Sequence, residues 1–240
     1  MDPYVYPNSS VLINKLNILD EQELIDVEAQ LLIAGIIDIH SIMDDLDFRK
    51  YSSLQTIHRF LFEELYTWAG EFRTINIYKS ERVLNGLSIT YSNKSQIISD
   101  LKRIFKWAEQ IQWTHQNPQL PSQFAKLLTD IWRVHPYREG NTRTVSIFMK
   151  LFADKHNLTF NAELLSQNAG YLRNALVMAG VDEAPEPSYL HRIITDALSL
   201  SENEIVHQTD SNSEKYQSIG QYDVSNYEGK PFNTKTDESQ

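Results

Sequence analysis

The sequence has 240 residues, of which 41% are hydrophobic, with 4 tryptophans, 12 tyrosines and 10 phenylalanines, enough for one sizeable core. The formal net charge is −10 and no cluster of Lys and Arg occurs, so we expect no nucleic-acid partner. The chain has no cysteine, which excludes disulfides and thiolate metal sites. Signal-peptide and membrane-span patterns are missing, so we expect a cytoplasmic protein with no membrane partner, while export without a cleaved signal stays open.

Hydrophobic periodicity predicts a helix in each half of the first 70 residues. Asp20-Glu21-Gln22-Glu23 has the form of a capping box and opens a helix that runs to about Ala34. The next helix starts at Ser52 or Ser53 and carries one apolar stripe, and Gly70 closes it. Residues 1–50 therefore form a helical extension in front of the main domain.

The rest of the chain to residue 200 is also predicted as helical. Residues 94–112 repeat the apolar pattern, Pro121 opens another helix, and two further helices cover 162–179 and 188–200. The segment 142–154 is apolar nearly all round, which is typical of a helix in the middle of a core. This pattern indicates an all-α fold.

Residues 74–91 break the helical pattern. Apolar and polar residues alternate from Thr74 to Tyr78 and again from Leu87 to Tyr91, with Asn85-Gly86 between them as a turn. We predict a short β-hairpin or extended flap there.

The segment His135–Arg143 carries the chemistry. His135 continues the inward face of its helix, and Pro136 disfavours helix at the residue before it, so the histidine is predicted at the lip of a core helix. Glu139-Gly140-Asn141 turn into the central helix, whose first N–H groups and positive dipole end form a ready anion site.

Two charged side chains extend this anion site. Arg143 adds a fork of donors for phosphate, and Glu139 is a hard oxygen ligand suited to Mg²⁺ beside phosphates. The alternative for His135 is a core histidine without a catalytic role, and the alternative for Gly140-Asn141 is a plain turn between two helices. Zinc is disfavoured because no third ligand is indicated and Pro136 interrupts the helix that an HExxH-like geometry needs.

The stretch HPYREGNTRTVS resembles the Fic family motif His-Pro-Phe-x-Asp/Glu-Gly-Asn-Gly-Arg-x-x-Arg. The resemblance extends to Ile57–Phe62 and Trp68–Ile77 upstream and to Tyr171–Ala175 downstream, and it ends near residue 198. It implies a Fic-type helical bundle with a hairpin flap over residues 51–198, between the N-terminal extension and a polar tail over 199–240.

The resemblance also implies an activity, protein adenylyltransferase, which moves AMP from ATP to a Ser, Thr or Tyr hydroxyl of a target protein. His135 would be the general base and Glu139 would hold Mg²⁺ on the phosphates. The residues that the resemblance places at the nucleotide are Lys79, Ser80, Gly140, Asn141, Thr142, Arg143, Tyr171 and Asn174, the last two near the adenine. The flap would pin an extended target segment by main-chain pairing, and self-modification and homo-oligomers stay open.

Two positions depart from the family pattern, and one segment of the tail resembles a regulatory element of the family. Thr142 stands where the family has Gly, and Ser146 stands where it has a second Arg that contacts the γ-phosphate. In the tail, Val224–Gly229 resembles an inhibitory helix, so Glu228 is predicted as a regulatory carboxylate that reaches Arg143; a solvated tail is the alternative.

Other activities of such a site are removal of AMP, Doc-like kinase activity and a non-catalytic nucleotide-binding module. Gly140-Asn141-Thr142 argues against the kinase, because Doc-like relatives carry Asn-Lys-Arg after the acidic position.

Overall fold

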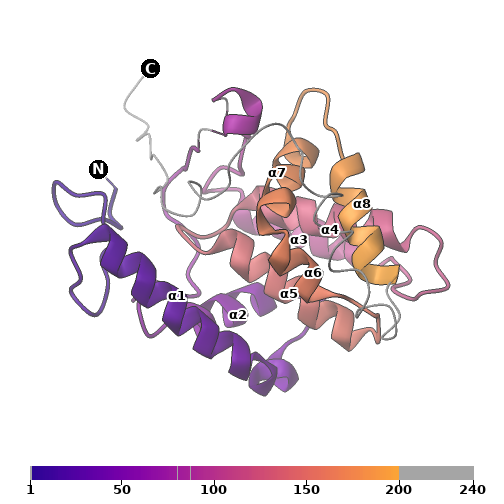
Figure 1. Cartoon of the computed structure of the whole chain (residues 1–240), viewed down its shortest axis with the longest axis horizontal. Coiled ribbons are helices and arrows are strands. Elements are labelled where there is room, and N and C mark those ends of the chain that lie inside the picture. The colour runs from indigo at the N-terminus through magenta and orange to yellow at the C-terminus, as the bar shows by residue number, and fades with distance from the viewer. Residues whose placement is uncertain (1, 80, 87, 200–240) are drawn as a thin grey trace.

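The computed structural model describes residues 2–79, 81–86 and 88–199, and within them the chain is helical and has no strand, only an isolated bridge between Val5 and Leu12 (Figure 1). The elements are α1 (Glu21–Asp38), η1 (Ile39–Asp45), α2 (Ser52–Phe62), η2 (Arg82–Leu84), α3 (Ile97–Ala108), α4 (Leu120–Val134), α5 (Asn141–Lys155), α6 (Ala162–Gln167), α7 (Ala169–Gly180) and α8 (Ser188–Ser199). The predicted all-α class is confirmed. None of the described helices combines the length and apolarity needed to cross a membrane.

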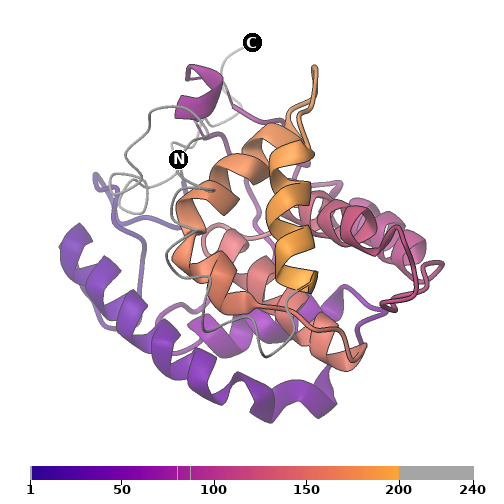
Figure 2. The same cartoon turned by 45° about the vertical axis from the view of Figure 1, so that its right-hand side comes forward.

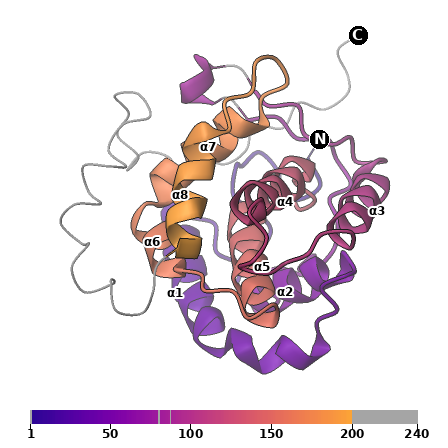
Figure 3. The ribbon, with the colours of Figure 1, turned by 90° about the vertical axis from the view of Figure 1, so that its right-hand side faces the viewer.

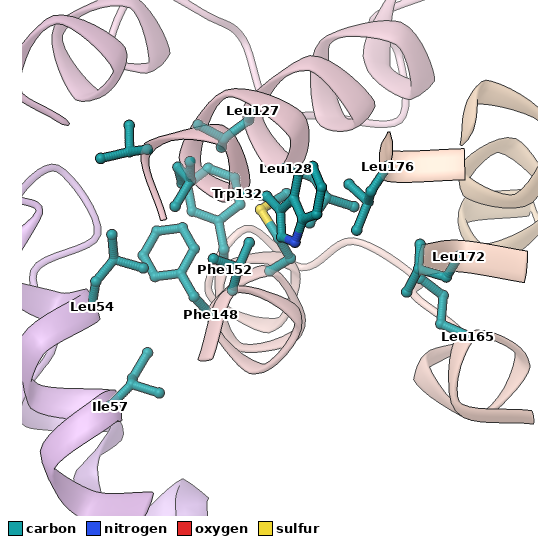
Figure 4. Close-up of a cluster of buried hydrophobic side chains, with 14 of the residues drawn as sticks. Leu54, Ile57, Leu127, Leu128, Trp132, Phe148, Phe152, Leu165, Leu172 and Leu176 are labelled. Atoms are coloured by element: carbon teal, nitrogen blue, oxygen red, sulfur yellow. The ribbon is translucent and has the colours of Figure 1, made fainter. Parts of the chain in front are cut away.

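Helices α4 and α5 occupy the centre of the bundle. α5 packs against α2 and α4, and α4 also packs against α3, α7 and α8, so both are surrounded when the molecule is viewed from the side in Figure 3. In the close-up of the core, Trp132 lies between the phenylalanines of α5 and the leucines of α7 (Figure 4). The predicted central position of the helix after the motif is therefore correct, and it explains why that segment is apolar nearly all round.

Two predicted helix bounds need correction. α2 ends at Phe62, eight residues before Gly70, and turns follow it, the first closed by Leu65 N–H, which donates to the Phe62 carbonyl three residues back at 3.0 Å. The segment predicted as one helix over 162–179 is two, α6 and α7, and Asn168 separates them by donating from its side chain to the Leu164 carbonyl at 2.7 Å. In both places a local hydrogen bond ends a helix that the apolar pattern alone would continue.

Of the two forms predicted for residues 74–91, the described part takes the extended flap and not the β-hairpin. The described part of residues 74–91 contains no ladder of backbone pairs; η2 lies at its tip, and Lys79 N–H donates to the Ser88 hydroxyl at 3.3 Å. Arg73 joins the two arms at their base, since its guanidinium donates to the carbonyls of Ile75 and Ser92. A side chain thus supplies the link that strand pairing was expected to supply, and we keep the name flap for residues 74–91.

The N-terminal extension packs on the domain that carries the motif. α1 begins as predicted, with the Asp20 carboxylate accepting from Glu23 N–H at 2.8 Å, and it lies along α2 on the outside of the bundle (Figure 2). Asp2 forms a buried ion pair with Arg138 of the motif at 2.9 Å. The first residues of the chain therefore help to hold the candidate site, and the boundary predicted at residue 50 stays a prediction.

Candidate active site

His135 is the left-handed C-cap of α4, with a φ of 49°. Its ring is fully buried, and Nδ1 lies 2.9 Å from the Trp132 carbonyl oxygen. Because a carbonyl only accepts, Nδ1 carries the proton, and Nε2 therefore holds the lone pair of the neutral ring. The backbone turn thus fixes both the orientation and the tautomer of the predicted base.

The surroundings of His135 favour its neutral form. Burial lowers the pKa of the imidazole well below 6.5, and the nearby Arg173 charge lowers it further. The ring of Tyr91, at the end of the flap, lies against it with 4.2 Å between ring centroids. At neutral pH the ring is therefore a base that can accept a proton, and Tyr91 of the flap covers it.

The phosphate loop, which we define as residues 135–143, turns at Gly140. Its φ of 76° is in the left-handed region, and a Cβ added there would lie 2.5 Å from Cζ of Phe62. Asn141 braces the turn with both ends of its side-chain amide, accepting from Tyr137 N–H and donating to the Tyr137 carbonyl, each at 2.8 Å. The amide of Asn141 therefore holds the loop in shape, and its contact with phosphate stays a prediction.

His58 of α2 packs against the phosphate loop and forms a hydrogen bond with it. Its Nδ1 accepts from Gly70 N–H at 2.8 Å, so its Nε2 donates to the Glu139 carbonyl at 3.1 Å. The ring also stacks on Tyr137 with 3.8 Å between centroids. Burial lowers the pKa of His58 to about 3, so the ring stays neutral over the physiological range. His58 stands in a segment that resembles the family, but nothing in the sequence assigned it this supporting role.

Arg143, the predicted phosphate donor, is held by two carboxylates. It forms ion pairs with Glu28 of α1 and, at 3.2 Å, with Glu139 of the loop. Glu28 is buried and also accepts from the Tyr66 hydroxyl at 2.5 Å. Sequence reasoning missed Glu28, which lies 115 residues away along the chain and follows no motif. Among the described residues the carboxylates on Arg143 are therefore Glu28 and Glu139; Glu228 lies outside these residues, and its contact with Arg143 stays a prediction.

Glu139 fits the role of a magnesium ligand beside phosphates. Its Oε1 accepts from Gly140 N–H at 2.9 Å and its side chain is partly exposed at the loop. No group of three or more metal-binding side chains forms among the described residues. A magnesium ion that binds through one carboxylate and substrate phosphates does not need such a group.

Thr142 and Arg173 meet at the first turn of α5. The Thr142 hydroxyl accepts from Trp132 Nε1 at 3.0 Å and from Arg173 Nη1 at 3.4 Å. With two donors directed at its oxygen, the hydroxyl keeps its own hydrogen for a further acceptor. Thr142 is therefore anchored at the loop, and Ser146 lies half-buried one turn further along α5.

The remaining predicted nucleotide residues are placed as follows. Lys79 of the flap lies within electrostatic range of Glu139, and burial together with the Arg173 charge lowers its pKa to about 8. Tyr171 directs its hydroxyl to the Tyr189 carbonyl of α8, at 3.2 Å, and Asn174 lies half-buried on α7. Ser80 lies outside the described residues. The roles of all four stay predictions.

Arg73 fastens the flap to the phosphate loop and was also missed. Its Nε donates to the His135 carbonyl and its backbone N–H to the Pro136 carbonyl, at 2.7 and 2.8 Å. Burial lowers the pKa of this guanidinium to about 10, which leaves it charged at neutral pH. The base of the flap is therefore tied to the loop by hydrogen bonds.

Comparison with known proteins identifies relatives of this arrangement. The sequence model of the Fic/DOC family matches residues 47–153. A probable protein adenylyltransferase of Sinorhizobium fredii is 34% identical over 155 residues, 62% of this chain and 74% of the relative. A probable protein adenylyltransferase Fic of Escherichia coli is 26% identical over 154 residues, 63% of this chain and 72% of the relative.

Solved structures share the fold. The N-terminal FIC domain of Bep8 from Bartonella sp. 1-1C matches with a TM-score of 0.67 at 19% identity, over 84% of this chain and 96% of that chain. The BepC protein of Bartonella tribocorum, solved with bound AMPPNP, matches with a TM-score of 0.63 at 20% identity, over 81% and 95%. These similarities confirm the predicted helical bundle.

Proposed function

This chain belongs to the Fic/DOC family, and from that premise we propose that it transfers AMP from ATP to a hydroxyl side chain of a target protein. The curated relatives are named protein adenylyltransferases, which confirms the expected enzyme class, a nucleotidyltransferase. The observation that carries the proposal is the neutral, oriented His135 beside the start of α5, because a base and an anion site then adjoin.

The transfer is a single displacement at the α-phosphorus. The target hydroxyl oxygen forms a bond to that phosphorus, the bond from it to the bridging oxygen of the β-phosphate breaks, and diphosphate leaves. The hydroxyl proton moves to Nε2 of His135, whose Nδ1 stays bonded to the Trp132 carbonyl. The Nδ1 hydrogen bond also stabilises the imidazolium that forms.

The phosphates lie at the N-terminus of α5 in this proposal. No side chain caps that end of α5 in the described chain, so its first N–H groups and the Thr142 hydroxyl are suited to phosphate oxygens. Glu139 would hold Mg²⁺, which supplies positive charge against the phosphates when bound. Lys79, Tyr171 and Asn174 are the proposed further contacts to the nucleotide.

The partner is a protein segment that lies along the flap. Exposed Tyr78 and half-buried residues beside it offer a surface for an extended segment. Because Tyr91 covers His135, this side chain must shift before a hydroxyl reaches Nε2. A second copy of this chain is one such partner, and label on the chain itself would identify self-modification.

Autoinhibition is part of the same proposal. A carboxylate on Arg143 competes with phosphate for its donors, and Glu28 makes that contact. We therefore propose that release of Glu28 accompanies nucleotide binding.

The test is incorporation of label from ATP in a cell lysate, with mass spectrometry of the labelled band. We expect label from α-³²P-ATP and none from γ-³²P-ATP, and dependence on magnesium. Label from γ-³²P-ATP would indicate a kinase, and loss of AMP from a modified protein would indicate the reverse reaction. Absence of both labels under all conditions would overturn the proposed transfer.

A further inference from the structure

Arg173 brings a positive charge to the phosphate loop from outside the motif. It stands on α7, yet its Nη1 donates to the Thr142 hydroxyl at 3.4 Å and its guanidinium carbon lies 5.3 Å from the centre of the Trp132 ring. The side chain is 15% exposed. The guanidinium is thus fixed beside the first turn of α5, where the proposed function places the phosphates.

Glu81 of the flap is the counter-ion of Arg173. Its Oε1 lies 2.6 Å from Arg173 Nη2, and the carboxylate side chain is only 1% exposed. Tyr91 directs its hydroxyl at the same oxygen at 3.5 Å. The pair therefore joins the tip of the flap to the phosphate loop.

Not all donors of Arg173 are used by these contacts. Its Nε is buried and has no hydrogen-bond partner within residues 2–79, 81–86 and 88–199. A buried N–H of a charged group without an acceptor is costly, and a guanidinium offers five donors in a rigid fork suited to phosphate. The geometry therefore leaves part of the fork available to an anionic ligand.

The other cation of the first turn is less available. Arg143 is already paired with two carboxylates, Glu28 and Glu139, and Ser146 one turn later brings no charge. A triphosphate at this loop therefore needs a further cation, and Arg173 already donates to the Thr142 hydroxyl of the loop.

We propose that Arg173 binds the phosphates of the nucleotide and that Glu81 competes with them for its guanidinium. This proposal rests on the proposed function for the site but concerns the affinity for phosphate rather than the chemistry. Phosphate and the Glu81 carboxylate accept from the same fork, so nucleotide binding weakens the link between flap tip and loop. The flap is then released to receive a target segment when a nucleotide is present.

The test is calorimetry of the full chain with ATP and with adenosine. Arg173→Met should weaken ATP binding by about 10- to 100-fold, the usual contribution of hydrogen bonds to a charged group, and leave adenosine binding unchanged. The ATP affinity of Arg173→Lys should lie between that of the wild type and that of Arg173→Met, because lysine keeps the positive charge but loses the fork of donors. Arg192→Met, which removes an exposed arginine of α8, is the matched control and should bind ATP like the wild type.

Glu81→Gln separates competition from mere positioning. It should tighten ATP binding severalfold in the wild-type background and have no effect in the Arg173→Met background. Equal ATP binding by wild type and Arg173→Met, or an equal loss of ATP and adenosine, would overturn the proposal. Wild-type protein that binds ATP but transfers no label would instead overturn the proposed function alone. If Arg173→Met does not fold, Arg173→Lys replaces it and is measured with Glu81 and with Glu81→Gln. Wild-type ATP affinity of both Arg173→Lys proteins would overturn the proposal that Arg173 binds the phosphates.

Discussion

The phosphate loop and the flap are neighbours that are held in different ways. Buried contacts from three elements fix the loop: His58 from α2, Asp2 from the N-terminal segment and the amide of Asn141 from α5. The flap is fastened at its base by Arg73 and at its tip by the Glu81–Arg173 ion pair, with no ladder of backbone pairs in its described part. The loop is braced by buried contacts along its length. The flap is held by side-chain contacts, which include the bond from Thr74 N–H to the Tyr4 hydroxyl at 2.9 Å, and not by backbone pairing in its described part.

This difference indicates a division of work. Transfer at phosphorus needs a base and donors that do not reorganise, which the braced loop provides. A target segment and a nucleotide must enter and leave, and a segment that is held by side-chain contacts without a backbone ladder is suited to this. We therefore expect substitutions at the packed, uncharged positions of the loop to affect folding or chemistry, and substitutions at charged contacts to affect mainly binding.

Gly140→Ala should break the braced half and have the largest effect. An alanine with φ near 76° is strained by about 1–2 kcal/mol, and its Cβ would overlap the Phe62 ring, adding roughly 1–3 kcal/mol. We expect the free energy of unfolding, measured by urea denaturation, to fall by about 2–5 kcal/mol, and ATP binding to be lost. Gly35→Ala is the matched control, since it lies within α1 and its Cβ would make an ordinary 3.4 Å contact with Leu61. Equal stability of both variants would mean that the loop is not tightly packed.

Glu139→Ala should leave the fold intact and weaken magnesium-dependent ATP binding. Loss of the carboxylate removes the proposed hard ligand, for which we expect at least about a tenfold drop in affinity. Calorimetry with and without magnesium checks this, and Glu64→Ala, an exposed carboxylate, is the control. If Glu139→Ala binds magnesium-ATP as the wild type does, Glu139 is not the metal ligand.

Glu28→Gln tests the loop without changing a residue of the loop. It should free the guanidinium of Arg143, which Glu28 binds in the structure. Neutralising the carboxylate on Arg143 should tighten ATP binding by roughly 3- to 10-fold and raise transfer. Glu23→Gln, exposed on the same helix, should change neither. Truncation before residue 201 tests Glu228 separately: a gain on truncation but none with Glu28→Gln would assign the inhibition to the tail.

The smallest expected effect concerns the pH dependence of the transfer rate, which should be shifted to lower pH. Because burial lowers the pKa of His135, the ring keeps its neutral, basic form below pH 6.5, where an ordinary histidine is already half protonated. Transfer rates at saturating ATP should therefore stay level from pH 8 to 6.5 and fall only at lower pH. Initial rates across pH 5–8 check this, and a half-maximal rate above pH 6.5 would contradict the buried neutral base.

The sequence predicted those features of the site that lie close together along the chain. Apolar periodicity located the helices, and the nine residues from His135 to Arg143 contain the proposed base, the turn and the helix start. The partners of these residues were not predictable, because Glu28, Arg73 and Glu81 reach the loop only through folding. The sequence left a hairpin and an extended flap open for a related reason: alternation indicates an extended chain, but whether two arms pair depends on contacts such as those of Arg73.

The most direct test of the central claim is a comparison of wild type and His135→Ala in single-turnover transfer from α-³²P-ATP, with ATP affinity measured on the same samples. General base catalysis is typically worth about 10²- to 10⁴-fold in rate, so we predict a loss of that size with unchanged ATP affinity. Transfer by the variant at the wild-type rate would contradict the role of His135 as the base.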